Sequence, residues 1–124
     1  MTQMLSIAAG GAAGALLRFW ISSGVYGILG RGFPWGTLVV NVIGSLLMGF
    51  LYVLFMERMT VEPEVRAAII IGLLGSFTTF STFSIETLNL IEQADYMKAI
   101  LNMAVSVFAC LLAAWAGLLL GRQL

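Results

Sequence analysis

The sequence has no histidine, one cysteine, two prolines and few charged residues, which make up 10% of its 124 positions. An average soluble domain carries about 25% charged residues, and a short chain buries only a small fraction of its surface when it folds. Because 60% of the residues are hydrophobic, a soluble enzyme is excluded first. The lack of histidine also removes the usual general base and the commonest metal ligand.

Cysteine and charge exclude further classes of protein. Cys110 is alone, so the chain forms neither an intrachain disulfide nor a cysteine metal cluster. Six Lys or Arg residues balance six Asp or Glu residues, so there is no basic surface to bind nucleic acid. A small integral membrane protein remains, and we predict that it is not an enzyme.

Long apolar stretches take the place of the missing charge. A helix needs about 20 apolar residues to cross a bilayer, and these runs lack the alternation of barrel strands. We therefore predict one all-α membrane domain over residues 1–124, with four spans at about 4–29, 36–56, 64–91 and 97–121. Pro63 followed by Glu64 is typical of the first turn of a helix.

The positive charges do not choose an orientation in the membrane. They divide almost evenly between the two sides of a four-span protein, with Arg58, Arg66 and Arg122 on one and Arg31, Lys98 and, if it snorkels, Arg18 on the other. One interpretation is that a small protein gives noisy counts. The other is that both orientations insert and the working unit is an antiparallel homodimer, because four helices alone leave little room for a pore.

Small residues recur at helical spacing, which favours close contacts between helices in lipid. Gly10 and Gly14 make one such step, and Ser45 and Gly49 make another. A longer stripe on the last span comprises Ala109, Ala113, Gly117 and Gly121. These stripes specify packing rather than chemistry.

The third span has an unusual composition between Gly72 and Ser84, with six Ser or Thr residues, three Phe and two Gly. Thr and Gly are poor at holding a regular helix, and hydroxyls satisfy backbone groups that a break sets free. We therefore predict an unwound turn near Gly75 to Thr79. Broken helices at mid-membrane mark ion sites in transport proteins. The alternative is an unbroken polar helix bonded to its neighbours.

Aromatic rings and a few polar groups predict the lining of a path. Phe80 and Phe83 share a helix face, and ring edges carry partial positive charge, so rings beside hydroxyls can line an anion path without a full cation. The other polar groups within the spans are Asn41, Thr37, Arg18, Glu86, and the stripe Asn102, Ser106 and Cys110. Each has a structural alternative: interhelical hydrogen bonding for Asn41, an interfacial carboxylate for Glu86, and snorkelling for Arg18.

Three segments together resemble the Fluc/CrcB fluoride channels: Gly10–Phe19, Gly36–Ser45 and Gly72–Glu86. The string from Thr78 to Ser84 carries most of the specificity, and the similarity extends over essentially the whole chain. The resemblance implies passive export of fluoride across the bacterial inner or plasma membrane, which protects cells from fluoride toxicity. It also implies an antiparallel dual-topology homodimer with two separate pores.

The resemblance assigns roles to particular residues. Phe80 and Phe83 match rings that present their edges to the ion and come from different subunits in each pore. Gly75 and Thr78 match carbonyls that hold a structural Na⁺ on the dimer axis, and Arg18 matches a vestibule arginine. The expected ion pathway consists of Asn41, Phe80, Phe83, Ser81, Thr82, Thr79, Glu86, Ser106 and Arg18. Two positions depart from the common family pattern, Ser76 in place of a Gly and Cys110 in place of a hydroxyl.

Two other functions compete with the channel. A small proton-coupled multidrug exporter also has four spans and dual topology, but that class has a membrane-buried Glu in its first span, and here the only charge there is Arg18. A structural subunit without a transport role is the other. It predicts that polar residues of the third span affect stability alone.

Overall fold

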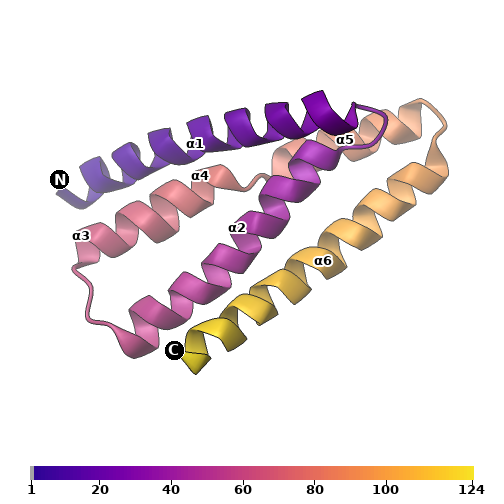
Figure 1. Cartoon of the computed structure of the whole chain (residues 1–124). Coiled ribbons are helices and arrows are strands. Elements are labelled where there is room, and N and C mark those ends of the chain that lie inside the picture. The colour runs from indigo at the N-terminus through magenta and orange to yellow at the C-terminus, as the bar shows by residue number, and fades with distance from the viewer. Residues whose placement is uncertain (1) are drawn as a thin grey trace.

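The computed structural model describes residues 2–124 and is all-helical over them (Figure 1). The first helix is α1 (Thr2–Leu29), and the second is α2 (Trp35–Val53), which continues as the π-helical η1 (Leu54–Arg58). The third helical run comprises α3 (Pro63–Arg66), the π-helical η2 (Ala67–Leu74), α4 (Gly75–Phe77) and α5 (Phe80–Glu92). The last helix is α6 (Tyr96–Gln123).

Four of these helical runs are long and apolar enough to cross a membrane: Thr2–Leu29, Trp35–Arg58, Pro63–Glu92 and Tyr96–Gln123. The prediction of four spanning helices is therefore confirmed, and each predicted range lies inside the corresponding run. Pro63 occupies the first turn of α3, as its place in the sequence indicates. The π-helical turns of η1 and η2 were not predicted, since no residue pattern in the sequence distinguishes them from α-helix.

The third run is interrupted between α4 and α5. Thr78 (φ −87°, ψ 159°) and Thr79 (φ −151°, ψ 119°) are extended. Gly75 keeps helical angles (φ −61°, ψ −34°), and Gly75–Phe77 is helical. The interruption is thus narrower than the 75–79 turn expected from the sequence. Glycine permits a break here, but the contacts of Thr79 described below place it three residues further along.

Two helix pairs make up most of the packing. In Figure 1, α1 runs alongside α3 and α4, and α2 runs alongside α6. Glycines allow the close approach within each pair. A Cβ at Gly14 would collide with the Leu73 carbonyl, and one at Gly117 would collide with the Leu46 carbonyl. Gly10 and Gly49, from the predicted small-residue steps, meet neighbouring backbones in the same way.

Candidate functional site

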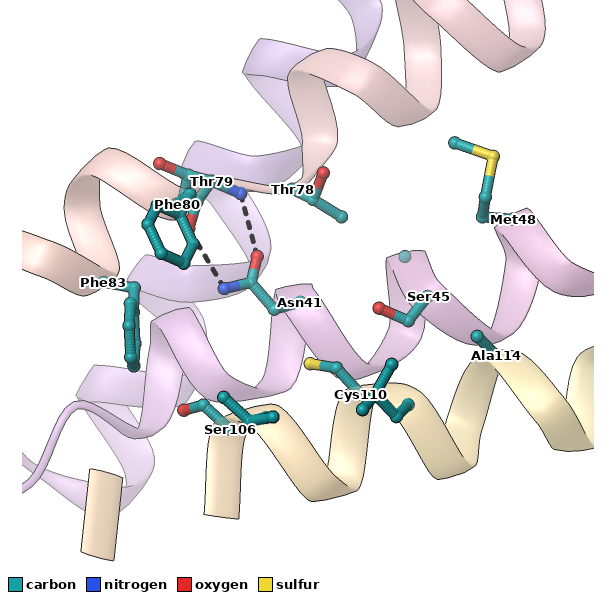
Figure 2. A pocket seen from close by; sticks show the side chains of 13 residues that line it. Asn41, Ser45, Met48, Thr78, Thr79, Phe80, Phe83, Ser106, Cys110 and Ala114 are labelled. Atoms are coloured by element: carbon teal, nitrogen blue, oxygen red, sulfur yellow. Dashed lines mark hydrogen bonds between the residues drawn. The ribbon is translucent and has the colours of Figure 1, made fainter. Parts of the chain in front are cut away.

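A cavity of about 430 Å³ lies between α2, the Thr78–Thr79 segment, α5 and α6 (Figure 2). Its lining contains no charged side chain, and its polar groups come from Asn41, Ser45, Thr78, Thr79, Ser106 and Cys110. Phe80, Phe83, Met48, Val107, Leu111, Ala114 and Gly44 complete the wall. We call this space the central cavity. It brings together three helical runs that are distant in the sequence.

Asn41 joins α2 to the extended segment through both atoms of its amide (Figure 2). Its Oδ1 accepts from the Thr79 backbone N–H at 2.8 Å, and its Nδ2 donates to the Thr79 carbonyl at 3.1 Å. This pair replaces the helical partners of Thr79, so it holds that residue extended. An amide nitrogen carries two hydrogens. Because Asn41 also lines the central cavity, its second N–H is a donor for a guest there.

The same bonds release two backbone carbonyls at the break. In a continuous helix the Thr79 N–H would bond the Gly75 carbonyl, but it bonds Asn41 instead. Likewise the Thr82 N–H, the helical partner of the Thr78 carbonyl, bonds the Thr79 hydroxyl at 3.1 Å as an N-cap. The carbonyls of Gly75 and Thr78 thereby lose their i+4 partners.

Phe80 and Phe83 lie one turn apart on α5 and both face the central cavity. Their ring centroids are 5.3 Å apart and the ring planes are tilted by 40°. Phe80 is 77% exposed, so one chain leaves most of this ring uncovered. Both rings therefore belong to the wall of the central cavity, and the edges of such rings carry partial positive charge.

Hydroxyl groups continue from the break along the first turn of α5. Thr79 Oγ1 donates to Thr82 Oγ1 at 3.0 Å, and it lies 3.4 Å from the hydroxyl of Ser81. Thr79 lines the central cavity, whereas Ser81 and Thr82 are outside its lining. The three hydroxyls therefore form a short connected group that begins at the cavity.

Glu86 lies beyond this group, in a second cavity of about 330 Å³ near the 30–34 and 93–95 loops. Its Oε2 accepts from the Tyr26 hydroxyl at 2.7 Å, and that hydroxyl is 3.3 Å from the Thr37 hydroxyl. Its Oε1 is buried without a hydrogen-bond partner in the described chain. The sequence alone does not indicate this contact of Tyr26, because only the fold brings α1 and α5 together here.

The polar stripe of α6 divides into two parts. Asn102, which is 2% exposed, donates to the Thr87 hydroxyl at 2.9 Å and accepts from Ser106 at 3.2 Å. This network bonds α6 to α5. Ser106 lies at the wall of the central cavity but is only 7% exposed, and its hydroxyl donates to Asn102 rather than into the cavity. Cys110 lines the cavity one turn further along.

Arg18 lies apart from both cavities and beside the break. Its Nε donates to the Ser76 carbonyl at 3.1 Å. Metal-binding side chains do not gather anywhere in residues 2–124: no group of three His, Cys, Asp or Glu residues is present.

The fold and its cavities define a class: a multi-pass membrane protein in which an uncharged cavity, lined by apolar side chains and a few polar groups, lies beside an interrupted helix. Residues 5–118 match the family model described as "CrcB-like protein, Camphor Resistance (CrcB)". The chain belongs to this family.

Relatives in three bacteria carry the name fluoride-specific ion channel FluC. The one from Methylococcus capsulatus is 56% identical over 98% of this chain and 54% of its own length, so the chain spans about half of that relative. The one from Magnetococcus marinus is 51% identical over 97% of this chain and 98% of its own. The Geobacter sulfurreducens relative is 47% identical over 100% of both. The predictions of family, of a multi-pass bacterial membrane protein and of a non-enzyme are confirmed.

Proposed function

We propose that this chain is a fluoride-selective channel through which fluoride leaves the cell passively. One observation carries the proposal: an uncharged cavity, with a mostly apolar wall into which an amide and several hydroxyls are set, occurs in a chain whose relatives of equal length are named fluoride-specific ion channels. A path for an ion needs sites that bind weakly enough to release it. Hydroxyls, one amide N–H and ring edges meet that condition better than a fixed Lys or Arg.

The proposed path begins in the central cavity at Asn41, Phe80 and Phe83. It continues along the hydroxyls of Thr79, Ser81 and Thr82 toward Glu86, with Ser106 in the wall of the cavity. The connected hydroxyl group supports this order. Arg18 adds positive charge beside the break. The proton-coupled exporter finds no support, since no carboxylate lines the central cavity.

The proposed working unit is an antiparallel homodimer with two pores, formed because the chain inserts in both orientations. The exposure of Phe80, at 77%, supports a partner surface over this ring. A second copy would then supply the ring that completes each pore.

A structural Na⁺ on the dimer axis fits the carbonyls of Gly75 and Thr78. Both have lost their helical partners to side chains, and oxygen atoms are the ligands that hard cations prefer. Two carbonyls do not complete the oxygen shell of a cation, so the proposed site takes the same pair from the second copy. The ion would hold the two breaks together by neutralising oxygens that face one another.

A flux assay tests the proposed function. Purified protein in liposomes loaded with KF should dissipate the fluoride gradient once valinomycin compensates the charge, and an equal KCl gradient should persist. Protein-free liposomes and Phe80→Ile protein serve as controls. Equal passage of both ions would contradict the selectivity, and no passage of fluoride would contradict the channel.

A labelling experiment tests dual topology separately. Thr60 is exposed in the loop before α3, so Thr60→Cys in a Cys110→Ala background places a single reactive thiol there. An impermeant maleimide should label about half of the thiols from outside sealed vesicles and the rest after permeabilisation. Labelling from one face alone would refute dual topology while leaving the flux result intact.

A further inference from the structure

Arg18 is the only charged residue of α1 and lies two-thirds of the way along it. Its side chain is partly buried, and its Nε donates to the backbone carbonyl of Ser76 at 3.1 Å, across 58 positions of sequence. Within residues 2–124 no carboxylate lies close enough to Arg18 to form an ion pair. The guanidinium therefore donates to a backbone carbonyl and is not paired with a carboxylate.

Ser76 stands at the carboxyl end of the helical run that begins at Pro63 and ends at Phe77. The last carbonyls of a helix have no partner within it and form the negative end of its dipole. The final backbone bond of this run goes from the Thr78 N–H to the Leu74 carbonyl at 3.2 Å. The Ser76 carbonyl lies past that bond, where a cationic donor satisfies both the orphan oxygen and the dipole.

Glycines set the register that brings Arg18 to this end. Gly10, Gly14 and Arg18 are spaced four residues apart, so they share one face of α1. A Cβ at Gly10 would collide with the Ala68 carbonyl and one at Gly14 with the Leu73 carbonyl. The two helices therefore touch backbone to backbone just before the break. This contact leaves the next residue of the row, Arg18, within reach of Ser76.

We propose that Arg18 is a positioning residue that caps the first half of the third span and holds the break in place. Asn41 holds the break from α2, at Thr79, and Arg18 holds it from α1, at Ser76. With Ser76 satisfied, the carbonyls of Gly75 and Thr78 are among those that remain without their helical partners. The effect of Arg18 on transport rests on the proposed channel function, whereas the contact and its effect on the break do not.

Positioning and simple attraction of anions make opposite demands on the side chain. Lysine keeps the positive charge but lacks the directional Nε–H and the planar fork of a guanidinium. If Arg18 acts by position, Arg18→Lys lowers the fluoride flux, and adding salt to wild-type protein does not lower the flux in the same way. If it acts by charge alone, Arg18→Lys is harmless and Arg18→Gln loses flux at low salt, where charges are least screened.

The first experiment compares Arg18→Lys and Arg18→Gln with the same two substitutions at Arg122. Arg122 is an exposed arginine at the end of α6 and lies outside the proposed machinery. Fluoride efflux from liposomes is measured at low and high ionic strength. We expect Arg18→Lys to lose about tenfold or more at both, the effect of removing one charge-assisted bond, and the Arg122 pair to match wild type. Wild-type flux in Arg18→Lys would overturn the proposal.

A second measurement needs neither flux nor a variant. In wild-type protein labelled with ¹⁵N-arginine and ¹³C′-serine, solid-state NMR in bilayers should detect a through-space coupling between Arg18 Nε and the Ser76 carbonyl carbon. A third measurement uses the folded variants: hydrogen exchange at the Thr78 and Thr79 amides should quicken by about tenfold in Arg18→Lys relative to Arg122→Lys. Absence of the coupling would overturn the proposal even if fluoride passes. If the coupling is present and wild-type protein carries no fluoride, only the channel function fails.

Discussion

The third helical run has two contrasting surfaces. One packs against α1 along η2, and the other forms part of the wall of the central cavity. Within one chain, only the first surface is covered by neighbouring residues. At the α1 contact, glycines bring backbone against backbone, and a Cβ at Gly14 would lie 2.9 Å from the Leu73 carbonyl carbon. At the cavity, Phe80 is 77% exposed, and Asn41 keeps a second amide N–H after bonding Thr79. Packing within one chain is therefore closed on one side of the run and open on the other.

The difference teaches where substitutions should affect stability and where they should affect transport. A closed surface has no room to relax, so added or lost atoms change the free energy of unfolding. An open polar surface contributes little to folding within the chain, and its side chains are available to an ion or to a second copy. Each of the following changes is chosen to break this division or to sharpen it.

The largest effect is expected from Gly14→Ala at the closed surface. The new methyl group meets backbone atoms that cannot rotate away, so we expect a loss of about 3 kcal/mol in the free energy of unfolding, or failure to assemble. Gly24→Ala is the matched control, since a Cβ at Gly24 meets nothing within 4 Å. It should be neutral or stabilising by about 0.5–1 kcal/mol. Thermal unfolding in detergent measures both, and equal stability of the two variants would contradict the packing.

A smaller loss of stability is expected from Asn102→Ala, inside the closed polar network of α5 and α6. Removal of the amide leaves the Ser106 hydroxyl without its acceptor and takes one donor from the Thr87 hydroxyl, which still donates to the Phe83 carbonyl. We expect a cost of about 1–2 kcal/mol. Fluoride flux per folded protein should stay near the wild-type value. Because Asn41 faces the cavity, Asn41→Ala should show the reverse. It should lower the fluoride flux more strongly than it lowers the free energy of unfolding. Equal behaviour of the two asparagines would break the comparison.

The smallest energetic effect is expected at the open surface, from Phe80→Ile and Phe83→Ile. Aromatic edge interactions are worth about 0.5–1.5 kcal/mol, which corresponds to a fall in fluoride flux of about threefold to tenfold. Stability and assembly should be unchanged, as size-exclusion chromatography would report. Phe108→Ile is the control, since Phe108 is 66% exposed on α6 and outside the cavity lining. Unchanged flux in all three variants would remove the rings from the path.

The helices were predictable because their signal is local. Long apolar runs, the loop charges and Pro63 indicate four spanning helices without any knowledge of their neighbours, and the structure has them. The interruption of the third run was predictable only approximately, because glycine and threonine mark a region of weak helix. Its place at Thr78 and Thr79 depends on Asn41, which is 38 positions away in the sequence.

The sequence predicts some of the residues that meet at the central cavity but none of their contacts. The Ser/Thr and Phe composition of the third span includes four residues of the cavity lining, Thr78, Thr79, Phe80 and Phe83. Tyr26 was missed because its hydroxyl acquires meaning only next to Glu86. Arg18 was expected in a vestibule, and its bond to Ser76 depends on a register that glycines on α1 set by close approach.

Composition and hydrophobic pattern by themselves determined that this protein is a helical membrane protein whose third span has an uncharged centre rich in Ser and Thr. This much is local information, because an apolar run long enough to cross lipid can be recognised without knowing which helices it packs against. The tertiary structure decided which polar groups are used up and which are left over. A hydrogen bond from a distant helix satisfies one backbone group and removes the partner of another. Asn41 accepts from the Thr79 N–H, and the Gly75 carbonyl thereby loses its helical donor. That exchange is a property of two helices in contact, and it leaves carbonyls, ring edges and an amide N–H beside the break.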